Sequence, residues 1–420
     1  MAAATYTPTL SSDGLDELWK KEQLGVVQAF GFGVPEWNFF NKLKNVETDW
    51  STREITMELD LDDGYGVASI PEGGYEARPS SPTAATATLT YILLNKRFTI
   101  SLTAKYIHDK RGTKAMLTDQ LKWQSKKAVQ AIRLKVGNYM YGFATGVLAH
   151  AAENATGTTH LTIDNLYGIS GLGATGSNRL ATDVFTAGDY IGDLTSSGTF
   201  RQITVPSAIA ASNVLTHASD WSTTADGDLL VGAASLENTS NAGTDYNRGL
   251  VGLLDMITST TVHSYANTSN SRWDPALENT SGGRFTGVKL RKMKQAINNQ
   301  GGGTLDKVLW TQGVENDVFA QLQAGLRFSD SFGMEMDGSP KSRGVKFLST
   351  KRVPDGYVFG WDSKRSVGKG TLLPEPGQVA WGGGEKIKDQ SGMIYSMDFP
   401  VFMATKSRAN MAMYSGITEQ

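Results

Sequence analysis

The sequence predicts an α+β fold, and three patterns support this. The first is a long stretch, residues 112–149, in which apolar residues recur at steps of three, four or seven, as on one face of an α-helix. The second is a set of segments in which apolar and polar residues alternate, which is typical of half-buried strands. The third is a region rich in Gly, Ala, Ser and Thr with short apolar runs, residues 151–237, which favours a small β-rich subdomain.

The composition is that of a folded protein without disulfides. The chain has 420 residues, 40% of them apolar and 20% charged, which allows two or three domains with a buried core. It contains no cysteine, which excludes disulfides, thiolate metal sites and thiol nucleophiles. The net charge of −2 gives no overall attraction to nucleic acid or acidic membranes. The sequence predicts neither a secretory signal nor a membrane span.

The N-terminal part is expected to form an arm followed by a long hairpin. In the arm, Ser11–Gly25 is predicted as a short helix and Gly31–Phe40 as extended chain. Strands are predicted at residues 53–61 and Ala85–Tyr91. Between them lies a polar segment of about twenty residues, 62–83, rich in Gly and Pro; loops of this length are usually functional, so we expect it to lie on another surface. A third strand, Phe98–Tyr106, leads into the long helix.

The C-terminal part combines short strands with two helices. In the β-rich region, strands are predicted at His160–Ile163, Tyr190–Leu194, Phe200–Val205, Asn213–His217 and Leu229–Val231. Residues 238–281 read as loop with one apolar turn at Leu250–Ile257. A helix at Phe285–Asn299, with Val288, Met293 and Ile297 inward, is ended by three glycines; a strand at Lys307–Thr311 and a helix at Val314–Ala324 follow. The last predicted strands are Val345–Leu348, Tyr357–Gly360, Ile394–Met397, Val401–Ala404 and Met411–Tyr414, and the final three are expected to return to the first sheet.

Sequence motifs give no support for catalysis. Gly171–Gly176 matches the dinucleotide pattern G-x-G-x-x-G, but it lacks the strand before it and the helix after it on which that chemistry depends. The five histidines are scattered without a metal-binding spacing, and no G-x-S-x-G elbow occurs. We therefore expect no enzyme, and no catalytic, cofactor-binding or metal-binding residues.

One stretch carries an unusual charge. Residues 105–135 contain nine basic and two acidic residues in a chain whose net charge is −2. The basic residues of interest are Lys114, Lys122, Lys126, Lys127 and Arg133. Two interpretations are open: an ordinary solvated helix face, or a face turned toward DNA or an acidic partner such as a scaffold, because clustered Lys and Arg neutralise phosphates without reading sequence.

The order of these elements resembles that of the major capsid proteins of tailed bacteriophages, which share the Hong Kong 97-type fold. The resemblance covers essentially the whole chain. It implies an N-terminal arm (1–45), an extended loop (46–96), a peripheral domain with a spine helix (97–150), an axial domain (151–390, with a β-rich insertion at 160–236) and C-terminal strands that complete the peripheral domain (391–420). The spine helix itself would be Thr113–Ala149.

The resemblance also implies partners. Members of this family form hexamers and pentamers in an icosahedral shell around double-stranded DNA, with a portal, and are found in the virion after assembly in the host cytoplasm. Contacts between subunits would come from the tip of the extended loop, at Asp62, Asp63, Glu72, Glu76 and Arg78. That tip contains no lysine, so we do not expect the covalent crosslinking that some members show. The short arm favours a separate scaffolding protein, and a decoration protein is a further expected partner; no membrane partner is expected.

Three other interpretations remain open. A non-viral, encapsulin-like shell protein would be distinguished by its cargo. Another phage structural or surface-binding protein, with the β-rich region as a recognition module, would form small oligomers instead of closed shells. An enzyme of a type without recognisable motifs would show a deep pocket with converging ionisable groups.

Overall fold

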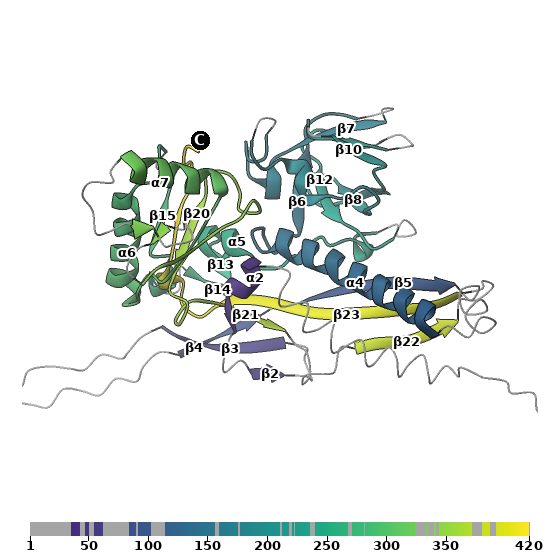
Figure 1. Cartoon of the computed structure of the whole chain (residues 1–420), viewed down its shortest axis with the longest axis horizontal. Coiled ribbons are helices and arrows are strands. Elements are labelled where there is room, and N and C mark those ends of the chain that lie inside the picture. The colour runs from purple at the N-terminus through teal and green to yellow at the C-terminus, as the bar shows by residue number, and fades with distance from the viewer. Residues whose placement is uncertain are drawn as a thin grey trace, which may run out of the picture. The chain divides into compact units, whose positions relative to one another are not determined.

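The computed structural model describes most of the chain (Figure 1). The chain divides into two compact units. The described residues are 35–42, 47–49, 54–61, 84–89, 91–101, 114–155, 159–174, 177–210, 212–217, 221, 223–235, 240–267, 271–280, 282–324, 333–334, 340–341, 344–371, 380–386 and 392–419. Within these, one unit takes its residues from 1–38, 92–137 and 370–401, and the other from 39–91, 138–369 and 402–420. The predicted helix at Ser11–Gly25 lies outside the described residues.

Most of one very long strand belongs to the first unit. Strand β23 (Gly392–Thr405) pairs antiparallel with β5 (Ile92–Ser101) and with β22 (Ala380–Lys386), and its last four residues belong to the other unit. Phe98 stacks on Tyr395, which lies opposite it in the ladder, with 5.8 Å between the ring centroids. The two strands predicted around residue 399 are therefore one. The alternation predicted from Phe98 onward begins earlier, at Ile92, and residues 102–113 lie outside the described residues.

Helix α4 (Lys114–Tyr139) is the longest helix of the described part of the chain. Its buried side is the predicted one, because Ala128, Ile132, Val136 and Tyr139 are all less than 5% exposed. The prediction that the helix continues to Ala149 is wrong. The chain leaves the helix in tight turns, in which Gly142 N–H donates to the Tyr139 carbonyl and Gly146 adopts φ +73°.

The residues after helix α4 form strand β6 (Val147–Ala151) instead of more helix. Gly146 lies seven residues after the last helical residue, and its left-handed conformation, which glycine takes without strain, lets the chain turn there into β6. Asn247 N–H donates to the Thr145 carbonyl in this turn, and Leu253 N–H donates to the Met140 carbonyl directly after the helix, so long-range contacts hold the chain where the helix has ended.

The predicted hairpin is present. Strand β3 (Glu54–Asp60) pairs antiparallel with β4 (Ala84–Leu89), from Ile55 opposite Leu89 to Asp60 opposite Ala84, and β2 (Glu47–Asp49) adds a third strand. Met57 and Leu59 are buried while Glu58 between them is exposed, as the alternation predicts. The segment between the two strands, 62–83, lies outside the described residues.

The β-rich region forms a seven-stranded sheet in the order β10–β11–β7–β6–β12–β8–β9. All five predicted strands are confirmed within one or two residues: β7 (His160–Asp164), β8 (Ile191–Leu194), β9 (Phe200–Thr204), β11 (Val214–Thr216) and β12 (Leu229–Gly232). The sequence did not indicate β10 (Ala208–Ala210) or β6. Val147, Leu194 and Val231 form a buried cluster on this sheet.

A five-stranded sheet with two helices forms the other core of this unit. Its order is β15 (Leu277–Asn279), β24 (Met411–Tyr414), β20 (Val358–Trp361), β16 (Lys307–Trp310) and β19 (Lys346–Ser349). Helix α6 (Gly287–Gly301) ends at Gly302, which adopts φ 59°, and α7 is Gln312–Ala324. Met293 and Ile297 are buried as predicted, but Val288 is 57% exposed; Leu290 is the buried residue of that turn.

The final strand corrects a further prediction. Met411–Tyr414 does not return to the sheet of the hairpin, because β24 lies between β15 and β20. Its four residues are all buried, which is typical of a central strand covered on both faces. Alternation could not reveal this, since a strand buried on both faces has none.

Two pairs of short antiparallel strands are also present: β17 (Gly333–Met334) with β18 (Pro340–Lys341), and β13 (Thr261–Val262) with β14 (Tyr265–Ala266).

Two more segments differ from their predictions. The aromatic segment before Asn41 is a short helix, α2 (Pro35–Phe39), instead of extended chain. Proline suits a first helical position, and after the helix Phe40 stacks on Trp361 at 4.9 Å between ring centroids. Strand β1 (Asn41–Lys42) then pairs in parallel with β21 (Val367–Thr371).

The predicted loop at 238–281 holds helix α5 (Leu253–Thr258) as well as strands β13 and β14. The carbonyls at the end of α5 are bound by the buried Arg408 guanidinium. Its Nε donates to Met256 O at 2.7 Å, and its Nη2 donates to Ile257 O at 2.7 Å and Ser259 O at 2.8 Å. The end of α5 is therefore capped by Arg408, which is about 150 residues away in the sequence, and not by neighbouring residues whose pattern could have predicted it.

Candidate interaction surfaces

Helix α4 brings together part of the basic stretch predicted from the sequence. Lys126 and Lys127 are exposed, and Arg133 is partly buried. Lys114 and Lys122 belong to the same helix, but their side chains lie outside the described part. Asp119 is the one acidic residue of the helix against six basic ones, so the helix carries a strong net positive charge, as predicted.

The environment of these cations differs along the helix. Lys127 Nζ lies 5.9 Å from the centroid of the Trp123 ring, a cation–π contact across one helical turn. Burial lowers the pKa of Arg133 from its ordinary value. The exposed lysines are therefore the side chains best placed to meet another molecule, while Arg133 is part of the protein's own packing.

The predicted subunit contacts at the loop tip cannot be placed in the same way. Asp62, Asp63, Glu72, Glu76 and Arg78 all lie outside the described residues. What the structure describes is the base of their hairpin. There Thr88 N–H in β4 donates to the His263 carbonyl at 3.1 Å, which attaches the end of strand β4 to the β13–β14 hairpin.

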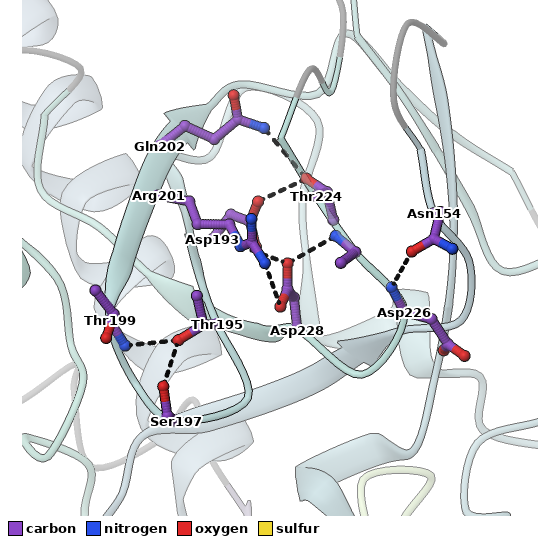
Figure 2. A network of polar contacts seen from close by, with 11 residues as sticks. Asn154, Asp193, Thr195, Ser197, Thr199, Arg201, Gln202, Thr224, Asp226 and Asp228 are labelled. Atoms are coloured by element: carbon purple, nitrogen blue, oxygen red, sulfur yellow. Dashed lines mark hydrogen bonds and ion pairs between the residues drawn. The ribbon is translucent and has the colours of Figure 1, made fainter.

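A second polar cluster lies in the seven-stranded sheet (Figure 2). Arg201 in β9 and Asp228 form an ion pair, with 2.8 Å between Nε and Oδ2. Thr224 donates its hydroxyl to Asp193 Oδ2 at 2.5 Å and accepts from Gln202 Nε2 at 3.2 Å. These bonds attach the loop before β12 to strands β8 and β9.

Asp193 is the buried carboxyl of this cluster. Burial raises its pKa from 3.8 to about 6, and the neighbouring Asp228 carboxylate acts in the same direction, while the Thr224 hydroxyl opposes the rise. Asp228 of the same loop is used locally: its Oδ2 accepts from Ala225 N–H at 2.7 Å. We interpret the cluster as a structural network, because its polar atoms are directed at the protein's own strands and loop (Figure 2).

The described residues offer no other recognisable site. They contain no group of three or more His, Cys, Asp and Glu side chains arranged to hold a metal ion. None of the helices in the described ranges is both long and apolar enough to cross a membrane.

Sequence reasoning missed three functional or structural side chains. Trp123 and Leu134 are exposed on helix α4, 56% and 48% respectively, and their spacing opposite the buried face was a usable signal. Asp193 was not recognisable, because an isolated acid in a short strand carries no pattern that predicts burial.

Comparison with known proteins identifies the fold. No protein-family model matches the chain. No curated protein matches it either. Among solved structures, the capsid asymmetric unit of cyanophage A-1(L) matches with a TM-score of 0.51 at 10% identity, over 92% of this chain and 93% of that one.

Weaker matches include the capsid of an empty GTA particle (TM-score 0.43, 10% identity, 91% of this chain and 89% of that one). An encapsulin complex from Synechococcus elongatus matches 40% of this chain and 56% of that one, with a TM-score of 0.30 at 14% identity. Neither is similar enough to support an argument. The cyanophage match extends over nearly the whole of both chains, and it confirms the predicted α+β class and the resemblance at the level of fold: this chain has the Hong Kong 97-type fold of phage capsid proteins.

Proposed function

We propose that the chain is a major capsid protein that assembles as hexamers and pentamers into an icosahedral shell around double-stranded phage DNA. The observation that carries the proposal is the full-length fold similarity to the cyanophage capsid subunit. The proposed role is structural, without a catalytic centre or a cofactor. Its proposed location is the virion, after assembly in the host cytoplasm.

The proposed division of labour follows the family. Residues 1–45 would act as arm, 46–96 as extended loop and 97–150 as peripheral domain. Residues 151–390 would form the axial domain, with 160–236 as its insertion, while 391–401 would complete the peripheral domain. The division departs from the sequence expectation after Val401, because β24 pairs within the five-stranded sheet.

The extended loop would supply contacts between subunits. Its base is a well-formed hairpin, and the polar tip, with Asp62, Asp63, Glu72, Glu76 and Arg78, would bind a neighbouring subunit by charge. Contacts between unlike patches can close into rings, and rings can close into a shell. A separate scaffolding protein, a portal and a decoration protein are the further partners we propose, and the basic side chains of α4 would face packaged DNA or the scaffold.

Assembly tests this proposal. The full chain, produced alone and together with the products of its neighbouring genes, should form closed shells or hexamer sheets visible by negative-stain microscopy. Arg78→Glu should leave the monomer folded and reduce shell yield, with Lys351→Glu, which reverses the charge of an exposed side chain outside the loop, as the control. Equal yields from the wild type and Arg78→Glu would count against the loop's role, and small oligomers under every condition would count against the shell.

An encapsulin-like shell is the second candidate. It predicts the same particles but filled with a protein cargo instead of DNA. Nuclease-protected nucleic acid inside purified particles would distinguish the two.

A further inference from the structure

The exposed side of helix α4 carries a line of side chains opposite its buried face. Trp123, Lys127, Gln130 and Leu134 follow one another at steps of four, three and four, and all four are exposed. At about 100° per residue they fall within a sector of about 60°, on the side opposite Ala128, Ile132 and Val136. We call these four residues the α4 stripe; it is about 17 Å long, or three helical turns.

The α4 stripe is more apolar than a solvated helix face requires. The described residues leave five large apolar side chains exposed, and two of them, Trp123 and Leu134, stand at the two ends of this stripe. Tryptophan is enriched among the residues that dominate binding energy at protein interfaces. The Lys127 ammonium lies 5.9 Å from the centroid of the Trp123 ring, and the tryptophan nevertheless remains 56% exposed.

The spacing is that of a coiled-coil seam. Steps of four, three and four place Trp123 and Gln130 at d positions and Lys127 and Leu134 at a positions of a heptad. Apolar residues stand at the ends, and polar residues occupy the centre. A single polar residue at an a position selects register and partner in coiled coils, because it must meet a complementary group.

The charge of the helix defines that complementary group. Lys126 is exposed beside the α4 stripe, and the helix has six basic residues against Asp119 alone. A partner that covers the α4 stripe therefore needs an apolar ridge of about three turns, a carboxylate near its centre to meet Lys127, and further carboxylates on its flanks. A DNA duplex supplies the negative charge, but its phosphate backbone offers no apolar surface for Leu134 and Trp123.

We propose that the α4 stripe binds an acidic amphipathic helix of a partner protein, by helix-to-helix packing of the coiled-coil kind. The inference deepens the proposed function, on which it rests, by choosing between DNA and a protein scaffold as the molecule that meets this face. The central contacts are Trp123 and Leu134 against apolar side chains and Lys127 against a carboxylate.

The test measures binding of a defined probe to the full chain. The probe is a fluorescein-labelled three-heptad peptide with Leu at a and d, one central a-position Glu, and Glu at e and g so that it does not pair with itself. A scrambled peptide of the same composition and a labelled DNA duplex serve as comparison ligands. Anisotropy titrations at about 50 and 200 mM salt separate apolar from purely electrostatic binding.

The proposal predicts a specific pattern. The ordered peptide should bind at least about tenfold more tightly than the scrambled one, and Trp123→Ala should weaken binding at least about tenfold. Leu134→Ala and Lys127→Glu should each weaken it at least about fivefold. The matched control is Val288→Ala with Lys292→Ala, which removes another exposed apolar–lysine pair at the same spacing on helix α6 and should change binding less than about twofold.

Each contrary result overturns the proposal. Equal loss in the control variant would show general attraction to basic helices. Tight binding of the duplex with no effect of Trp123→Ala or Leu134→Ala would assign the face to DNA. Absence of peptide binding would show that the α4 stripe does not bind an acidic amphipathic helix. Shell assembly of the wild-type chain is scored separately by microscopy, so shells without peptide binding refute this inference alone, and peptide binding without shells refutes the proposed function.

Discussion

Replacing Asp193 by Asn should affect the stability of the seven-stranded sheet more favourably at neutral and alkaline pH than in acid. Asp193 is fully buried, and burial raises its pKa from 3.8 to about 6. The folded state therefore holds the proton more tightly than the unfolded chain. The stability that depends on this proton is complete below pH about 4, falls as the pH rises to about 6, and is lost above that.

The magnitude follows from the difference between the two pKa values. A rise of about two pH units corresponds to about 3 kcal/mol between the protonated and ionised forms. Asn keeps the oxygen that accepts from the Thr224 hydroxyl and has no charge to bury. The effect of Asp193→Asn on the opening free energy should therefore be more favourable at pH 8 than at pH 4 by about 2 kcal/mol, whatever the substitution costs in packing; this is less than the full difference because the unfolded carboxyl is already partly ionised at pH 4.

Hydrogen exchange is the suitable assay, because the chain has several cores and does not promise two-state unfolding. Exchange of the amides in β8, β9 and β12 is compared between variant and wild type at each pH, so that intrinsic exchange rates cancel. Asp226→Asn, an exposed acid of the same loop, is the control and should show no such difference. A variant that gains no more at pH 8 than at pH 4 would refute the reasoning and show that Asp193 is ionised without penalty.

Three further predictions concern stability and assembly. Arg408→Ala should lower the opening free energy of the amides in α5 and β24 by about 3 kcal/mol or more in hydrogen exchange, because three carbonyls lose a buried cation; a loss below about 1 kcal/mol would contradict this. Gly146→Ala should destabilise the folded state by more than about 2 kcal/mol, because the added Cβ would clash with the Asp245 carbonyl oxygen. Gly171→Ala is the control, since Gly171 has a similar φ but open space around it, and it should cost about 1 kcal/mol. Equal losses in the two variants would show that the clash does not matter. Glu76→Lys should leave the melting temperature unchanged and reduce shell yield, and normal assembly would contradict it.

Local patterns predicted the elements that local physics decides. The β3 strand alternates because one face is buried, and Met57 and Leu59 are indeed buried beside the exposed Glu58. The end of helix α6 at its glycines follows from the left-handed conformation of Gly302. In both cases the residues that set the structure are neighbours in the sequence.

Long-range contacts decided what the sequence could not show. Strand β24 has four buried residues and no alternation, so its place between β15 and β20 could not be predicted. Tyr139 ends helix α4 with its hydroxyl bonded to Asp245 at 2.5 Å, more than a hundred residues away. The candidate surface lies between these cases: the charge of α4 was visible in the sequence, and the exposure of Trp123 and Leu134, which the structure shows, could have been inferred from their spacing opposite the buried face.

Electron cryo-microscopy of particles assembled from the full chain tests the central claim most directly. The account predicts closed shells with five-fold and six-fold positions occupied by this chain. In the map, the β3–β4 hairpin would extend over a neighbouring subunit, with helix α4 and the long strand β23 recognisable in each copy. A uniform population of monomers or small oligomers, even with the scaffolding partner present, would contradict the claim that this fold serves here to build a shell.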